Sequence, residues 1–220
     1  MLNELKIIRE WIKIHDHFGV PVSFSQVLDI LGRYKESHRA YHTSRHIADC
    51  LREFDSLYGR GTKADDALAI KLALIFHDVI YDVSSKTNEE DSAAYARVYM
   101  SVKDFPAMIR EEVSRLIILT KKHRTVLAED SNGEKMIDVD MSVLAWPWEK
   151  YEVYAKGIWH EYSSVADQTA YREGRAAFLS SIHPEHVFCT PEMTTRANHS
   201  NVAWNIAKEI DALGRGSIFR

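Results

Sequence analysis

The stretch Ala67-Leu68-Ala69-Ile70-Lys71-Leu72-Ala73-Leu74-Ile75-Phe76-His77-Asp78 decides the fold that this sequence predicts. Nine of the ten residues from Ala67 to Phe76 are apolar and none is proline or glycine, which is typical of a helix buried on nearly every side. An ionised carboxylate in such a setting is costly unless it is paired, hydrogen-bonded or bound to a metal. His77 and Asp78 therefore need partners, and two interpretations are open: a metal ion, or a turn carboxylate beside a core histidine.

The rest of the chain also favours helices. Apolar residues recur at spacings of three and four, and glycine, proline or polar loops separate the segments. We expect helices over approximately residues 2–18, 23–32, 43–58, 62–76, 87–98, 106–120, 136–145, 148–162, 167–182 and 203–213. No alternating run long enough for a strand is present, so the predicted fold class is all-α. We expect residues 1–187 to form one helical domain and residues 188–220 to add a C-terminal amphipathic helix and tail packed on that domain.

Composition excludes several classes of protein. The 220 residues are 45% hydrophobic and 27% charged, and the net charge of −4 comes from interspersed signs. A general nucleic-acid or membrane-surface binder would need a basic face instead. No apolar run is long enough for a membrane span and the charged N-terminus is unlike a secretory signal, so we expect a cytoplasmic protein. Cys50 and Cys189 lack CxxC spacing, and Cys50 is expected in the core.

Charged residues in otherwise apolar helices single out a candidate site. His42 and His46 lie four residues apart where a helix begins near Thr43 or Ser44, and Asp138 and Asp140 lie inside the apolar segment 136–145. Imidazole nitrogens with carboxylate oxygens suit zinc, manganese, iron or magnesium and leave coordination positions open for water and substrate.

The order His46, His77-Asp78, Asp140 resembles the HD-domain superfamily of metal-dependent phosphohydrolases. A bacterial family of HD-type phosphohydrolases is similar in particular over roughly residues 35–182, through YHTSRHIADCL (41–51), FHDVIYD (76–82), NEEDSA (88–93), IDVDMSVLA (137–145) and YREGR (171–175). This resemblance implies an HD-type helical bundle with its metal site between core helices.

The resemblance also implies a ligand set. His46 would be the first ligand, His77 and Asp78 the second and third, and Asp140 the fourth, while Asp138 would serve as a cap or as an acceptor outside the ligand set. One divalent ion is expected, either zinc, manganese, iron, magnesium, nickel or cobalt. Many members carry a lysine or a further histidine where this chain has Tyr81 and Asp82, so a second, fully liganded metal is not expected.

Two residues are candidates for proton transfer. YHTSRHIAD resembles the motif of cyclic-nucleotide phosphodiesterases in which the earlier histidine protonates the leaving oxygen, so His42 is the candidate general acid. The alternative is a buried, hydrogen-bonded histidine. Asp82, four residues after Asp78 and on the same face of a helix, would orient the attacking water or accept its proton. The alternative for Asp82 is a structural cap.

Basic residues complete the predicted site. We expect Lys122, His123, Arg172 and Arg175 to bind the phosphate charge, and a solvated face is the alternative for the two arginines. The sequence thus predicts a hydrolase of a nucleotide or similar small phosphorylated metabolite. A non-catalytic, nucleotide-binding regulatory module is one alternative. An iron-dependent oxygenase is another, which the shortage of further histidines disfavours. We expect no stable nucleic-acid or membrane partner, and a homodimer is left open.

Overall fold

The computed structural model describes residues 2–123, 129–197 and 199–219, and in these ranges the chain is helical and contains no β-strand. The predicted all-α class is confirmed. The elements, in chain order, are α1 (Leu2–His17), α2 (Phe24–Arg33), α3 (Ser44–Tyr58), α4 (Ala64–Phe76), α5 (Asn88–Val102), α6 (Ala107–Thr120), α7 (Ser131–Met141), the 3₁₀ helix η1 (Ser142–Ala145), α8 (Trp148–Tyr162), α9 (Gln168–Ser180), α10 (Pro191–Arg196), α11 (His199–Arg215) and the 3₁₀ helix η2 (Ser217–Phe219). Within the described ranges, no helix combines the length and the apolar character that crossing a membrane requires.

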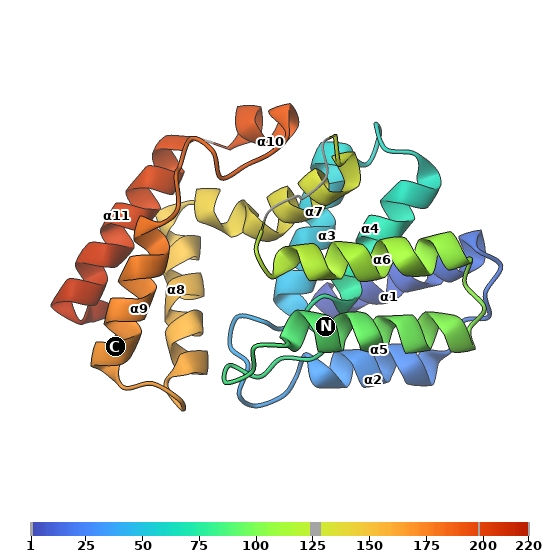
Figure 1. Ribbon diagram of the computed structural model, residues 1–220, viewed down its shortest axis with the longest axis horizontal. Helices are drawn as coiled ribbons and strands as arrows, with labels where there is room; N and C mark the ends of the chain where they lie inside the picture. Colours follow the sequence, from blue (N-terminus) through green and yellow to red (C-terminus); the bar gives the residue numbers. More distant parts are fainter. Residues whose placement is uncertain (1, 124–128, 198, 220) are drawn as a thin grey trace.

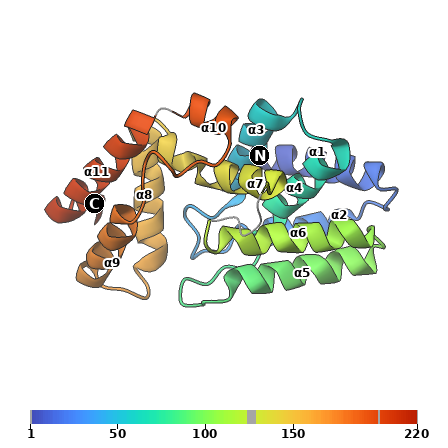
Figure 2. The ribbon, with the colours of Figure 1, turned by 45° about the horizontal axis from the view of Figure 1, so that its top comes forward.

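Helix α4 is the centre of the larger of two lobes. Ala69, Ile70 and residues 72–76 are all buried, as expected for a helix that is apolar on every side. Helices α1, α3, α5, α6 and α7 contact α4, and Figures 1 and 2 show them arranged around it. The C-terminal end of α4 therefore lies deep inside this lobe, and the residues that follow it start from the protein interior.

The buried apolar side chains form two clusters. The first cluster runs from Ile7 to Val139 and belongs to α1–α7, which we call the first lobe. The second runs from Val143 to Ile218 and belongs to η1, α8–α11 and η2, the second lobe. Figure 1 shows α8, α9 and α11 side by side, apart from α1–α6, with α7 leading toward them. The core thus divides close to residue 141, and α11 packs on α8, α9 and η1.

A buried carboxylate ties the two lobes together. Asp138 of α7 is fully buried and accepts hydrogen bonds from the backbone N–H groups of Cys189 (2.6 Å) and Thr190 (2.8 Å). The hydroxyl groups of Thr190 (2.6 Å) and Tyr58 (3.2 Å) also donate to it. Because both carboxylate oxygens are satisfied in this way, Asp138 fixes the segment before α10 against α7 and α3.

A second buried carboxylate holds α1 against α4. Glu10 is 1% exposed and accepts hydrogen bonds from Lys71 of α4 (2.9 Å) and from Lys6 (3.0 Å) and Lys13 (3.1 Å) of its own helix. Burial alone would raise the pKa of Glu10, but the hydrogen bonds from Lys71 and Lys6 outweigh it and lower the pKa from 4.5 to about 2.

This lowered pKa predicts how stability depends on pH. Glu10 contributes stability above pH 4.5, and that contribution is lost as the pH falls from 4.5 toward 2, because the unfolded chain binds the proton first. Glu10→Gln should lower the free energy of unfolding by about 1–3 kcal/mol at pH 7 and by much less near pH 3. Urea denaturation of both proteins at several pH values measures the difference. A loss that is the same at every pH would contradict the assignment.

Candidate metal centre and its cavity

Three helices of the first lobe direct polar side chains to one point. His46 lies in the first turn of α3, whose N-cap is Thr43, one of the two residues expected there: its side chain accepts the Arg45 N–H at 3.3 Å. His77 and Asp78 directly follow the end of α4. Asp140 lies in the last turn of α7. Residues far apart in the sequence thus meet inside the lobe.

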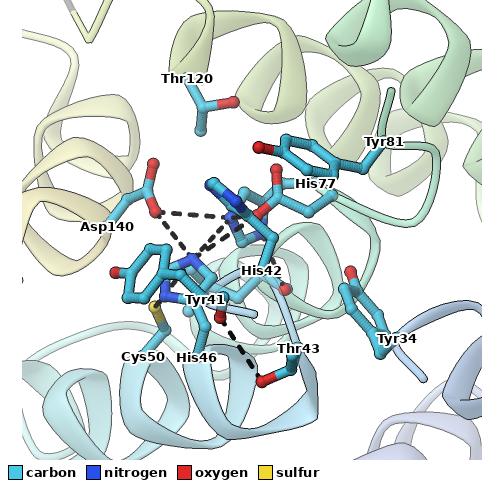
Figure 3. A network of polar contacts seen from close by, with 12 residues as sticks. Tyr34, Tyr41, His42, Thr43, His46, Cys50, His77, Tyr81, Thr120 and Asp140 are labelled. Atoms are coloured by element: carbon cyan, nitrogen blue, oxygen red, sulfur yellow. Dashed lines mark hydrogen bonds and ion pairs between the residues drawn. The ribbon is translucent and has the colours of Figure 1, made fainter. Parts of the chain in front are cut away.

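The side chains of His46, His77 and Asp140 form a tight, largely buried cluster (Figure 3). Nε2 of His46 lies 3.2 Å from Nε2 of His77 and 3.2 Å from Oδ1 of Asp140. Nε2 of His77 lies 3.4 Å from the same carboxylate oxygen. Two nitrogens and one oxygen are therefore directed at one another from three separate elements.

Asp78 adds a second carboxylate to this cluster. Its Oδ2 lies 2.9 Å from Nε2 of His77 and 3.6 Å from Nε2 of His46. This oxygen is buried, and within the described residues it has no hydrogen bond of acceptable geometry. A buried carboxylate oxygen without such a bond is rare and costly, and its ion pair with His77 is what offsets that cost here.

The charges of the cluster influence one another strongly. Burial opposes the protonated form of His77, but the carboxylates of Asp78 and Asp140 outweigh this and hold its pKa well above the ordinary value. Burial likewise opposes ionisation of Asp78 and Asp140, but His77 lowers the pKa of both carboxyls. The two acids thus remain ionised in a buried site, which is the state that binds a cation.

The donor set fits a divalent metal ion. Two imidazole nitrogens with carboxylate oxygens are typical ligands for zinc, iron, manganese and their neighbours. The cluster of His46, His77 and Asp140 could hold such an ion, and the unsatisfied Oδ2 of Asp78 lies beside it. His46, His77, Asp78 and Asp140 are the four residues that the sequence predicts as ligands.

Neighbouring groups orient the two histidines. Nδ1 of His77 donates to the backbone carbonyl of Leu74 at 3.0 Å, which leaves its Nε2 to face the cluster. Nδ1 of His46 lies 3.6 Å from Sγ of Cys50. The sequence predicts Cys50 only as a core residue; it is buried, and its position four residues after His46 also places it on the histidine's face of α3.

Asp138 and Asp140 have different environments. Asp138 accepts its hydrogen bonds from Cys189, Thr190 and Tyr58, as described above, and is not part of the cluster. Asp140 has Oδ1 in the cluster and Oδ2 3.1 Å from Nε2 of His123. The two carboxylates, two residues apart on α7, thus serve different parts of the structure.

His42 lies beside the cluster, held by a glutamate of the second lobe. Nδ1 of His42 donates to Oε2 of Glu161 at 2.7 Å, and the hydroxyl of Tyr81 donates to the same oxygen at 2.9 Å. Oε1 of Glu161 accepts the backbone N–H groups of residues 40, 41 and 42 at 2.7, 2.7 and 2.9 Å. With Nδ1 engaged, Nε2 is the nitrogen of His42 that remains for other partners.

Sequence reasoning missed Glu161. It is 1% exposed, and burial would raise its pKa, but the hydrogen bonds with His42 and the backbone outweigh this and lower the pKa to about 2. Burial opposes the charged form of His42, but Asp78, and after it the ion pair with Glu161, outweigh this and raise the pKa of His42. One signal was present in the sequence: Glu161 follows Ile158 by three residues, so it continues the apolar stripe of its helix with a carboxylate.

The cluster opens into a cavity of about 850 Å³ between the two lobes. From the first lobe the cavity is lined by His42, His77, Asp78, Tyr81, Val83, Ser85, Lys86, Asn88, Glu89, Thr120, Lys121, His123 and Asp140. Residues of α8 and α9 and of the loop between them form the opposite wall. A cavity of this size is in the range of small-molecule sites.

The structure places only two of the four predicted phosphate-binding residues at the cavity. His123 and Arg175 line the cavity, whereas Lys122 and Arg172 do not. Lys122 is exposed on the turn after α6, and the guanidinium of Arg172 lies 5.9 Å from the ring centroid of Phe219. Lys121, which we did not single out from the sequence, lines the cavity instead of its neighbour Lys122.

The prediction that Asp82 lies on the same helix face as Asp78 is wrong. Helix α4 ends at Phe76 and residues 77–87 form turns, so Asp78 and Asp82 do not share a helix face. The Asp82 side chain is exposed and accepts hydrogen bonds from the backbone N–H (2.8 Å) and hydroxyl (2.7 Å) of Ser84. It is not among the residues that line the cavity, and its contacts are those of a turn.

Because the two aspartates of α7 have different environments, their substitution should affect metal binding differently. Asp140→Asn should weaken metal binding by more than about 100-fold, since it removes an anionic oxygen from the cluster, whereas Asp138→Asn should change affinity by no more than about 10-fold. Asp82→Asn, a change at an exposed turn, is the control. Metal content by mass spectrometry, with calorimetric titration of the metal-free proteins, measures this order. Weaker binding by Asp138→Asn than by Asp140→Asn would contradict the assignment.

Comparisons of the chain with protein-family models, curated proteins and solved structures found no match. The observations that bear on function are therefore the chemistry and geometry of the site.

Proposed function

We propose that the protein is a metal-dependent phosphohydrolase of the HD type that cleaves a small phosphate ester. The observation that carries this proposal is the cluster of two imidazoles and two carboxylates at the edge of a large cavity. The order of these residues along the chain, which resembles the HD superfamily, supports it. The arrangement agrees with an HD-type helical bundle, in which the ligands come from separate core helices.

His46, His77, Asp78 and Asp140 would hold the ion. A divalent ion bound by such residues lowers the pKa of a water molecule and polarises a phosphoryl oxygen. The carbonyl of Leu74 fixes the ring of His77, and helices α3 and α7 position His46 and Asp140. The residues of the chain thus supply a preorganised anionic pocket, and the open side of the cluster faces the cavity.

His42 is the residue proposed to protonate the leaving oxygen. Its ring lines the cavity and lies beside Tyr81, with centroids 4.3 Å apart, and Glu161 binds its Nδ1. The proton donated to the leaving alcohol would come from Nε2. Glu161 acts through His42 and does not line the cavity, so it is a positioning residue.

Basic groups of the first lobe are proposed to hold the phosphate. Lys86, Lys121 and His123 line the same side of the cavity as the cluster. Nζ of Lys121 donates to the carbonyl of Lys86 at 2.6 Å, and Glu90 accepts from it as well, so a bound phosphate would compete with Glu90 for this ammonium group. Arg175 is a weaker candidate, because Glu209 already pairs with its guanidinium at 2.7 Å.

A substitution of His42 tests the catalytic proposal. His42→Ala should leave the metal content unchanged and lower turnover by roughly 10²–10⁴-fold on an alkyl phosphate, whose leaving alcohol needs a proton. Turnover of p-nitrophenyl phosphate should fall much less, since p-nitrophenolate leaves without one. Steady-state kinetics on both esters, with metal analysis of each sample, measures the contrast.

Three outcomes would count against this account. Equal losses on both esters would mean that His42 acts on the ligand cluster and not on the leaving group. Loss of the metal would make His42 a ligand. If the metal-loaded wild-type protein bound nucleotides but hydrolysed no member of a broad panel of phosphate esters, the regulatory module would replace the enzyme as the better account.

A further inference from the structure

The segment that follows α4 carries two of the four proposed metal ligands outside any helix. Residues 77–82 form turns, so the carbonyl groups there and at the end of α4 lack the partners that a continuing helix would give them. Side chains from other segments donate to these carbonyls instead: Tyr34 to Ile75, Arg39 to Asp78 and Val79, Ser92 to Ile80, and His38 to Tyr81. The position of this segment therefore depends on side chains that are remote in the sequence.

Arg39 binds backbone groups on both sides of the site. Its Nη1 donates to the carbonyl of Asp78 at 2.6 Å and to the carbonyl of His42 at 3.3 Å. Its Nη2 donates to the carbonyl of Val79 at 3.3 Å. The side chain is 0% exposed. One buried guanidinium thus joins the backbone of a proposed metal ligand to the backbone of the proposed general acid.

Neighbouring groups fix the orientation of this guanidinium. Its Cζ lies 5.2 Å from the ring centroid of Tyr34 and 5.3 Å from that of Tyr81. Both rings are held in turn, since the hydroxyl of Tyr34 donates to the carbonyl of Ile75 and the hydroxyl of Tyr81 donates to Glu161, each at 2.9 Å. Oε2 of Glu36 lies 2.9 Å from Nε and 2.9 Å from Nη2. The planar fork therefore has a fixed orientation in which its two terminal nitrogens reach the carbonyls.

The ion pair with Glu36 does not account for the burial of this arginine. The side chain of Glu36 is 40% exposed, and exposed ion pairs contribute little to stability, whereas burying a guanidinium is costly. Hydrogen bonds from a charged donor are stronger than those between neutral groups, and the carbonyls that Arg39 binds belong to the site. The single nitrogen of a lysine could not reach three carbonyls with the geometry of the fork. The residue type thus fits a role in holding two backbone segments together.

We propose that Arg39 is a positioning residue that sets the place of the metal ligand Asp78 relative to the proton donor His42. Arg39 does not line the cavity, so it acts through the backbone of these two residues and does not touch the substrate. Without the guanidinium, the carboxylate of Asp78 and the ring of His42 would move independently. The part of this inference that concerns His42 rests on the proposed function, whereas the part that concerns Asp78 rests on metal binding alone.

Zinc binding tests the effect on Asp78. Arg39→Lys keeps the charge but loses the fork, and it should weaken zinc binding by about 10–100-fold, the range for groups that orient metal ligands from outside the ligand set. Arg33→Lys is the control, because Arg33 also lies over a tyrosine ring (Tyr95, 4.6 Å) and pairs with a carboxylate (Asp29, 3.5 Å), but is neither in the cluster nor in the cavity lining. Its zinc affinity should change by less than about 3-fold. Calorimetric titration of the metal-free proteins with zinc measures both.

A further variant separates positioning from a contribution to folding. Glu36→Gln removes the ion pair but leaves the guanidinium and its carbonyl partners, so zinc affinity should again change by less than about 3-fold. Urea denaturation of each metal-free protein records its stability. Arg39→Lys that is less stable but binds zinc like the wild type would overturn the proposal, as would an equal loss of zinc affinity in Glu36→Gln. If Arg39→Lys does not fold, Arg39→Met, which removes the buried charge, takes its place with the same expected loss.

Two phosphate esters test the effect on His42. At saturating zinc, kcat of Arg39→Lys on an alkyl phosphate should fall at least about 5-fold more than kcat on p-nitrophenyl phosphate, because a displaced general acid matters only where the leaving group needs a proton. Equal losses on the two esters would overturn the part that concerns His42. If the wild-type protein hydrolyses neither ester, the proposed function fails, and the zinc titrations still decide whether Arg39 positions Asp78.

Discussion

The structure depends on a cluster of two buried imidazoles and two half-buried carboxylates where α3, α4 and α7 meet. Desolvation opposes ionisation of Asp78 and Asp140, and the positive charge that His77 can carry, or that a metal ion would carry, compensates for it. This cluster lies in the interior because α4 is buried on all sides and its C-terminal end delivers His77 and Asp78 there. The position of α4 therefore determines both the apolar core and the polar site, and a change in its packing would displace both.

The second lobe completes the site that the first lobe begins. Glu161 of α8 binds His42 and the backbone of residues 40–42, so the approach to α3 is fixed from the other lobe. Asp138 of α7 in turn holds residues 189 and 190, which precede α10. The cavity has walls from both lobes, with charged groups on one wall and aromatic groups on the other.

Local patterns in the sequence predict much of this structure. Apolar spacing gives the all-α class and the approximate helix bounds, and charges inside apolar segments identify His46, His77, Asp78 and the pair Asp138 and Asp140, of which the resemblance selects Asp140. Two kinds of feature escape such reasoning. Apolar spacing does not show that α4 ends at Phe76, just before the site. The prediction that Asp82 shares a helix face with Asp78 is therefore wrong. Residue spacing does not encode contacts between distant segments. The sequence therefore did not show that Glu161 binds His42 or that Lys121, and not Lys122, lines the cavity. Nor did it show that the core divides near residue 141.

The most direct test of the central claim is the position of a bound metal. Crystals of the protein soaked with zinc or manganese, measured at the absorption edge of the ion, would show it as an anomalous peak. We expect one peak about 2.0–2.3 Å from Nε2 of His46, Nε2 of His77 and carboxylate oxygens of Asp78 and Asp140. A peak that lies away from these four side chains, or a cluster that remains without an ion at saturating metal, would contradict the account.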